Sequence, residues 1–201
     1  YEANNAMHDC DLMINIGARF DDRITGKLDE FSPKSKKVHI DIDPSSINKN
    51  VKVDLAIVGD VKSVLSLTLN KLKKNKSKFL KSNKQKTSKW WEKIQKWRSI
   101  KSLDYIVSEE TIKPQFAIER LYELTKDKDS YITTEVGQHQ MWAAQHYKFN
   151  KPNRWMTSGG LGTMGYGLPA AVGVQVAHPK KLVIDIAGEA SVLMTMQEMS
   201  T

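Results

Sequence analysis

The chain contains 201 residues, with 31 Lys and Arg against 23 Asp and Glu, for a formal net charge of +8. Apolar residues make up 40% and charged residues 27%, which argues against global disorder. The longest mostly apolar stretch, residues 168–177, is far shorter than the roughly 20 residues that a membrane span needs. The one cysteine, Cys10, cannot form an internal disulfide, and no targeting segment is visible, so we expect a cytoplasmic protein.

The positive charge is concentrated in one segment. Residues 62–101 contain fourteen Lys and Arg and a single acid, Glu92, a net charge of +13, so that the rest of the chain carries −5. The chain is therefore a slightly acidic protein with a basic insert.

Clustered lysines favour nucleic-acid binding through counterion release, and three tryptophans in this insert offer stacking surfaces. The spacing of Trp90, Trp91, Ile94 and Trp97 instead indicates the apolar stripe of an amphipathic helix. The preceding stretch KKNKSKFLKSNKQKTSK (73–89) has the composition of a solvated linker. We therefore predict a linker with an amphipathic helix over residues 76–110 and no nucleic-acid partner.

The first unit, residues 1–75, shows the pattern of a parallel α/β sheet. Strand-like segments cover residues 11–17, 37–43 and 54–60, and a helix pattern follows over 61–72. Ligands of such sheets bind beyond the carboxyl ends of the strands. Asp41 follows Gly17 by 24 residues, a spacing compatible with a carboxylate on an adenosine ribose. The alternative is that the aspartates at these strand ends form turns and cap helices.

The second unit, residues 111–201, alternates more clearly between helix and strand. We predict helices over 113–126, 139–148 and 163–179, strands over 131–137 and 181–188, a short strand within 154–160, and a further helix from residue 190. Because the chain starts without methionine and stops within a helix-like apolar run, we expect it to be a piece of a longer protein.

Two glycine-rich junctions in this unit favour a diphosphate–metal site. Residues 158–165 (SGGLGTMG) leave a strand and open a helix, whose free amides and positive end can cradle a phosphate. Residues 185–191 (DIAGEAS) bring a carboxylate and a hydroxyl to a strand end, where Mg²⁺ would need oxygen ligands. His139 lies at a third such junction. We interpret the other four histidines as surface or packing residues, namely His8, His39, His146 and His178.

The segments GARFDDRITG, HIDIDPSSI, EVGQHQMWAAQ and SGGLGTMGYGLPAAVG resemble the catalytic subunit of acetohydroxyacid (acetolactate) synthases, a thiamine-diphosphate enzyme family. The resemblance runs through nearly the whole chain except the lysine-rich insert. It implies parts of two three-layer parallel-sheet domains, a central FAD-binding domain and a thiamine-diphosphate domain. The implied activity joins the two-carbon unit of decarboxylated pyruvate to a second 2-keto acid, in the biosynthesis of branched-chain amino acids.

The resemblance also implies site residues. By it, FAD contacts Gly17, Ala18, Arg19, Phe20, Asp21, Asp41, Ile42, Asp60 and Val61; thiamine diphosphate contacts Gln138, His139, Gly162, Thr163, Met164, Ala190 and Ser191; and Glu189 binds Mg²⁺. Arg23 is the candidate for holding the carboxylate of the second keto acid, because a guanidinium matches a carboxylate at two points. The implied partners are a second copy of the subunit and a regulatory small subunit.

The chain departs from the family in its metal motif. The family has Gly-Asp-Gly-Ser where this chain has Gly188-Glu189-Ala190-Ser191. Glutamate adds a methylene to a geometry that Mg²⁺ holds closely, and an alanine Cβ disfavours positive φ. The departure leaves two alternatives open, another thiamine-diphosphate decarboxylase or carboligase and a non-catalytic paralogue. The family's second metal ligand and its activating glutamate lie outside these residues, so we expect the 201 residues alone to be inactive.

Overall fold

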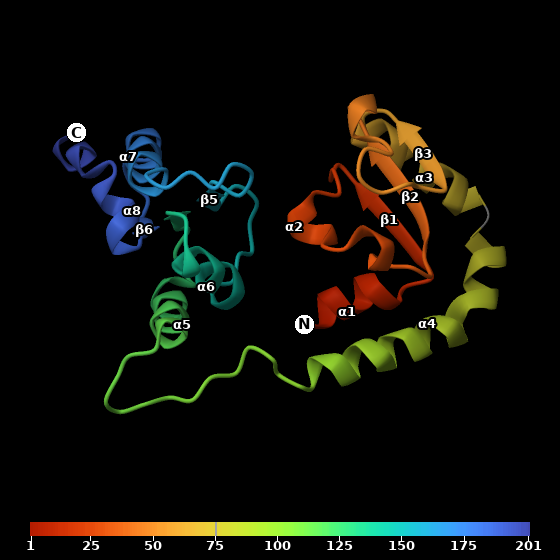
Figure 1. The fold of residues 1–201 in the computed structure, drawn as a ribbon, viewed down its shortest axis with the longest axis horizontal. Helices are drawn as coiled ribbons and strands as arrows, with labels where there is room; N and C mark the ends of the chain where they lie inside the picture. Colours follow the sequence, from red (N-terminus) through yellow and green to blue (C-terminus); the bar gives the residue numbers. More distant parts are fainter. Residues whose placement is uncertain (75) are drawn as a thin grey trace. The chain divides into compact units, whose positions relative to one another are not determined.

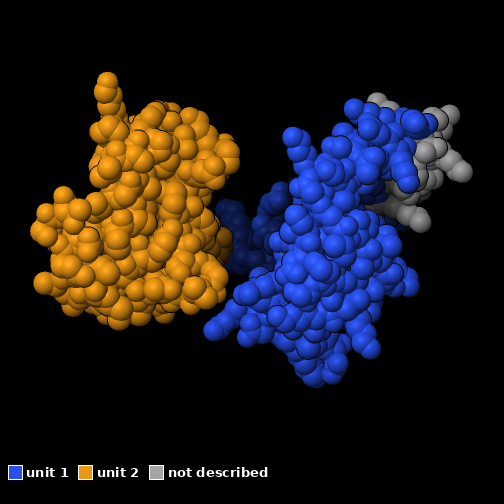
Figure 2. Space-filling model, turned by 90° about the horizontal axis from the view of Figure 1, so that it is seen from above, with its two compact units in different colours: residues 1–102 blue, residues 103–201 orange. Residues whose placement is uncertain are grey.

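The computed structural model describes the backbone of residues 1–74 and 76–201, and the side chains outside residues 75–86. The chain separates into two units, residues 1–102 and 103–201, which are described one at a time (Figure 2). Each unit holds a three-stranded sheet in which every pairing is parallel. The predicted α/β class with two parallel sheets is confirmed.

The first unit is built on a sheet of order β1-β2-β3 (Figure 1). Its elements are α1 (Glu2–Asp9), β1 (Leu12–Ile16), α2 (Asp22–Thr25), the 3-10 turns η1 (Leu28–Glu30) and η2 (Pro44–Ser46), β2 (Lys36–Asp41), β3 (Leu55–Val58), α3 (Val61–Lys74) and α4 (Lys76–Arg98). The three predicted strands and the helix that follows them are confirmed, with the strands one to three residues shorter than expected.

Parallel pairing brings the carboxyl ends of these strands to one edge. Ile16 pairs with Ile40, and Ile40 pairs with Ile57, so the three strands finish in register. Just beyond them, the Gly17 amide donates to the Ile40 carbonyl at 2.8 Å and the Gly59 amide donates to the Asp41 carbonyl at 2.9 Å. The segments that the sequence singled out therefore leave the sheet side by side.

Helix α4 contains the tryptophan spacing predicted to be helical, and that prediction is confirmed. The rings of Trp90 and Trp97 meet edge to face at 5.9 Å, and the Lys93 ammonium lies over both. Lys93 also donates to Asp9 of α1 at 2.7 Å, which links α4 to α1 within the first unit. The predicted solvated linker falls mainly on side chains outside those that the structure describes, and the predicted divisions at residues 75 and 110 stay predictions.

The second unit has the sheet order β5-β4-β6, with β4 in the centre. Its elements are α5 (Pro114–Thr125), β4 (Tyr131–Thr134), α6 (Gln138–His146), β5 (Trp155–Thr157), α7 (Gly167–Ala177), β6 (Val183–Ile186), α8 (Glu189–Leu193) and η3 (Met196–Ser200). Helix α7 begins four residues later than predicted, because the backbone takes positive φ at Gly162 and Gly165. The last predicted helix is divided into α8 and η3.

The core of the second unit forms around Ile132 of the central strand. Ile132 is fully buried with Ile118 of α5 and Tyr147, which follows α6. The Tyr147 hydroxyl is itself satisfied, lying 2.8 Å from the Thr125 hydroxyl and 3.1 Å from that of Ser130. An aliphatic side chain thus anchors the sheet to the helices on that face.

Replacing Ile132 with alanine should lower the free energy of unfolding by about 2–5 kcal/mol, because the fully buried site leaves a cavity. Urea unfolding followed by circular dichroism measures the change. Leu124→Ala on α5 is the matched control, since its side chain is 61% exposed and should lose less than about 1 kcal/mol. Equal losses in the two variants would contradict this assignment of the core.

Candidate functional site

A cavity of about 610 Å³ opens at the carboxyl end of the sheet in the second unit. Three strand-to-helix junctions contribute to its wall, one after β4, one between β5 and α7, and one after β6. The lining residues are Pro114, Ala117, Ile118, Val136, Gly137, Gln138, His139, Trp142, Met164, Ile186, Ala187, Gly188, Glu189, Ala190 and Ser191. The wall is therefore partly apolar, with polar groups supplied by the junctions.

Most of the residues predicted for a diphosphate cofactor meet in this cavity, namely Gln138, His139, Met164, Glu189, Ala190 and Ser191. They lie up to 53 positions apart in the sequence, and the parallel sheet brings them together. Gly162 and Thr163 do not line the cavity. The backbone of Gly162 lies beside Val136, and the Thr163 amide donates to the Ser158 hydroxyl at 2.9 Å.

Two glycines, Gly137 and Gly188, lie close to the His139 ring. A Cβ on Gly137 would lie 2.9 Å from the ring Cε1 atom, and a Cβ on Gly188 would also lie 2.9 Å from it. Gly137 has φ +154°, a backbone conformation that favours glycine. The Nε2 atom of His139 is buried and has no hydrogen-bond partner among the described residues. This nitrogen is a polar group at the cavity wall that a bound polar ligand would satisfy.

Glu135 fixes the glycine-rich junction before α7. Its fully buried carboxylate accepts the Gly165 amide at 2.6 Å and the Leu168 amide at 3.1 Å. These two amides are therefore bound by a carboxylate of the chain itself and are not free for a phosphate. The predicted contacts of Gly162, Thr163 and Met164 with a diphosphate stay predictions.

Asp185 of β6 is a second carboxylate near this junction, and unlike Glu135 it is only partly buried. Burial raises its pKa above the ordinary value of 3.8, and the nearby Glu135 charge acts in the same direction. The Thr133 hydroxyl donates to it at 2.8 Å and opposes the shift. A Cβ on Gly167 would lie 2.5 Å from this carboxylate, so only glycine lets α7 approach the sheet here.

The junction after β6 carries the altered metal motif. Ala190 lies in α8 and is absent from the residues with positive φ, so the backbone cost expected for this alanine does not arise. Glu189 is exposed at the cavity. Ser191 is 2% exposed, and its hydroxyl donates to the Val136 carbonyl at 3.1 Å. Among the described residues no three His, Cys, Asp or Glu side chains cluster as metal ligands.

In the first unit the carboxyl edge of the sheet gathers Gly17, Asp41, Asp60 and Val61, with Ile42 69% exposed beside them. A neighbouring pocket of about 390 Å³ is lined by Arg19 and Asp21 together with Lys49 and Asn50. Gly17 has φ +64° with open space around it. Most of the predicted FAD residues thus lie at this edge or in the pocket, whereas Phe20 is buried against Phe31 and His39. Their contacts with FAD stay predictions.

The aspartates at this edge differ in their surroundings. Asp21 caps α2 by accepting the Arg23 amide at 3.1 Å, and Asp60 accepts the amide and hydroxyl of Ser63 at 2.9 Å each. Those bonds hold the pKa of Asp60 below its usual range. Asp41 is instead nearly buried, 3.5 Å from a buried histidine. The helix-capping alternative therefore applies to Asp21 and Asp60, and Asp41 forms a turn by accepting the Asp43 amide at 2.9 Å. The predicted contact of Asp41 with a ribose stays a prediction.

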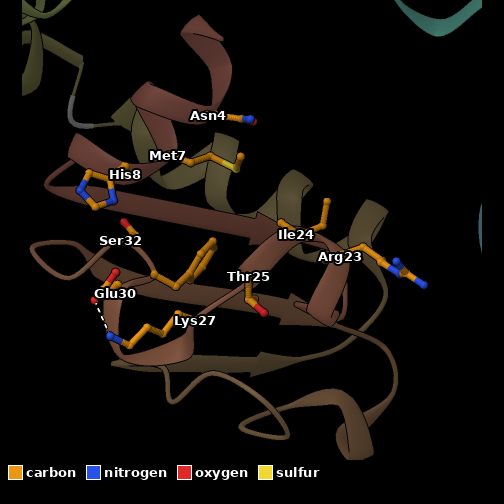
Figure 3. Close-up of a pocket in the computed structure, with 10 residues that line it drawn as sticks. Asn4, Met7, His8, Arg23, Ile24, Thr25, Lys27, Glu30 and Ser32 are labelled. Carbon is orange, nitrogen blue, oxygen red and sulfur yellow. Dashed lines mark hydrogen bonds and ion pairs between the residues drawn. The ribbon is translucent and has the colours of Figure 1, made fainter. Parts of the chain in front are cut away.

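Arg23 lies in a separate pocket of about 370 Å³ formed by α1, α2 and η1 (Figure 3). Met7, His8 and Ile24 contribute to the same wall, and Lys27 is paired with Glu30 at 2.6 Å. In Figure 3 the Arg23 side chain extends away from the other labelled side chains. Its predicted contact with a keto acid stays a prediction.

Comparison with known proteins assigns both units. Residues 1–68 match the family described as thiamine pyrophosphate enzyme, central domain, and residues 135–201 match thiamine pyrophosphate enzyme, C-terminal TPP binding domain. The chain belongs to the thiamine pyrophosphate enzymes. The cavity of the second unit lies in the domain that the family uses to bind this cofactor, also called thiamine diphosphate.

Curated relatives agree with this assignment. The chain is 52% identical to the acetolactate synthase large subunit of Buchnera aphidicola subsp. Schizaphis graminum, 48% to that of Haemophilus influenzae and 47% to the isozyme 3 large subunit of Escherichia coli. Each alignment covers 100% of this chain and 34% of the relative. The chain thus spans about a third of the length of these thiamine pyrophosphate enzymes.

Sequence reasoning missed several residues in and beside the cavity of the second unit. Trp142 and Pro114 line the wall, and Glu135 fixes the glycine-rich junction. A carboxylate directly after an apolar strand was the only available signal for Glu135, and such residues are usually exposed. Nothing in the sequence marks Trp142 and Pro114 as cavity residues, because their positions fit helices of any kind.

Replacing Gly137 with alanine should weaken thiamine diphosphate binding at least about tenfold, because the new Cβ displaces the His139 ring. Equilibrium titration of the full-length protein with the cofactor measures the change. Gly173→Ala in α7 is the control, since a Cβ there meets open space and should leave the affinity unchanged. Unaltered binding by the Gly137 variant would show that the ring position is unimportant.

Replacing Asp185 with asparagine should change how stability depends on pH. Because the pKa of Asp185 is raised, the folded state holds the proton more strongly than the unfolded state does. The free energy of unfolding of the wild type therefore falls as the pH rises from about 3.8 through the pKa of the folded state. The variant should therefore gain stability relative to wild type between acidic and neutral pH, measured by thermal unfolding. Exposed Asp127→Asn should show no such gain, and a parallel profile for both variants would refute the argument.

Proposed function

We propose that the chain is the cofactor-binding segment of an acetolactate synthase large subunit. The full-length enzyme would decarboxylate pyruvate and join the two-carbon unit to a second 2-keto acid in branched-chain amino-acid biosynthesis. The observation that carries the proposal is the meeting of Gln138, His139, Met164 and the segment 188–191 around one cavity, in a chain about half identical to such subunits.

The cavity residues fit a diphosphate cofactor. Thiamine diphosphate supplies a carbon nucleophile that can stabilise the carbanion left by decarboxylation. A polar group of the ligand would satisfy the unpaired His139 Nε2, and Gln138 adds an amide group to the cavity wall. Met164 and Trp142 supply apolar surface to the same wall. Glu189 is the residue of this chain that would bind Mg²⁺, with the phosphates and water supplying further oxygens.

The edge of the first unit fits a second cofactor. We assign FAD to it, with Gly17 allowing close backbone approach and Asp41 offering a buried carboxylate at the end of the central strand. Arg23 would hold the carboxylate of the second keto acid through its guanidinium. The proposed protein partners are a second large subunit and a regulatory small subunit.

We further propose a cytoplasmic location. None of the helices within the described part of the chain is both long and apolar enough to cross a bilayer. The bacterial relatives from Buchnera, Haemophilus and Escherichia are consistent with a bacterial-type enzyme.

The direct test of this function uses the full-length protein with pyruvate. Acetolactate should form together with one carbon dioxide per product, and both should depend on added thiamine diphosphate and Mg²⁺. A protein that binds the diphosphate cofactor but forms no acetolactate would instead support the non-catalytic alternative, which the motif Glu189-Ala190 motivates.

Restoring the family motif should strengthen metal-dependent cofactor binding. The double replacement Glu189→Asp with Ala190→Gly shortens the carboxylate arm and removes a Cβ beside the cavity, so we expect Mg²⁺–thiamine diphosphate affinity to rise about tenfold. Titration of the intact subunit at fixed cofactor and varied Mg²⁺ measures it. Glu198→Asp in η3, outside the cavity wall, is the control, and an unchanged affinity in the double variant would sink the idea.

A further inference from the structure

His39 occupies the centre of the first sheet. It lies in β2, between Asn15 of β1 and Ala56 of β3 in the strand register, and its side chain has 0% exposure. The Phe20 ring meets the imidazole edge to face at 5.1 Å. The histidine is therefore enclosed by the sheet and by the loop that follows β1.

Both ring nitrogens of His39 are buried without a hydrogen-bond partner among the described residues. Buried polar atoms are nearly always paired, and an unpaired one destabilises the fold. A residue that served only to fill this space would be better replaced by an apolar ring. We therefore expect the imidazole to act as a hydrogen-bonding group.

Asp41 supplies that role, because it lies two residues further along β2 and so on the same face. Its Oδ1 atom accepts the Asp43 amide at 2.9 Å, which fixes one side of the carboxylate. Its Oδ2 atom lies 3.5 Å from His39 Nε2, at the outer limit of hydrogen bonding. A movement of a few tenths of an ångström would complete the bond.

We propose that His39 is a positioning residue for a nucleotide ribose, donating from Nε2 to Oδ2 of Asp41. The two bonds, from Asp43 and from His39, then hold the carboxylate plane so that its outward lone pairs accept the ribose hydroxyls. The inference deepens the proposed FAD site and rests on it. It assigns to the buried histidine a function in recognition, although it touches no ligand itself.

The test measures FAD affinity of the full-length apoprotein by quenching of flavin fluorescence. His39→Phe keeps a ring of similar size but removes the donor, and affinity should fall about tenfold, equivalent to about 1.4 kcal/mol. His39→Gln places an amide N–H near the Nε2 position and should restore affinity to within about threefold of wild type. Thermal unfolding of each variant reports whether the fold is intact.

A double-mutant cycle with Asp41→Asn separates positioning from packing. In the Asp41→Asn background, His39→Phe should change FAD affinity less than twofold, because the histidine then has no carboxylate to orient. If His39→Phe retains wild-type affinity, or weakens binding equally with and without Asp41, the inference is overturned and the ring only packs. A wild-type protein that binds no FAD would overturn the proposed site itself, which is a distinct outcome.

Discussion

The buried carboxylate of Glu135 fixes the glycine-rich junction before α7, next to the cavity of the second unit. It leaves the end of the central strand β4 and binds two amides at the start of α7. The same bonds stop the strand after Thr134, hold the turn at Gly165 and set where α7 begins. The neighbouring junctions at residues 137–139 and 188–191 then meet beside it. A carboxylate at 0% exposure is tolerated here because its oxygens accept two backbone amides.

Four aspartates near the strand ends fall into two kinds according to their surroundings. Asp21 and Asp60 are local caps, whose acceptors are used by the first turn of a following helix. Asp41 and Asp185 lie against the sheets, where fewer solvent molecules compete and each hydrogen bond has a larger electrostatic effect. Only the second kind can respond strongly to a ligand. The distinction depends on packing, since all four residues follow or lie within apolar strands in the sequence.

Much of the fold could be predicted. The β-branched runs at 37–43 and 181–188 are strands because buried parallel strands need continuous apolar sequence. The helix after β3 follows from its own periodicity. The first residue of a helix is harder to predict from sequence, as α7 shows. Its glycines and its apolar residues fit a helix from residue 163, whereas the tertiary contact with Glu135 delays it to residue 167.

The sequence alone determined the class of the chain, its two parallel sheets and the polar residues that line the cavity, because strand periodicity and the long junction motifs are local properties. The tertiary structure decided which of those residues meet. It placed both Gly137 and Gly188 close to the His139 ring, bound the start of α7 to Glu135, and buried His39 beside Asp41. Gly188 and His139, like Glu135 and Gly165, are far apart in the chain, and the burial of His39 depends on the two neighbouring strands. The energies of these contacts depend on burial, which a linear pattern does not specify.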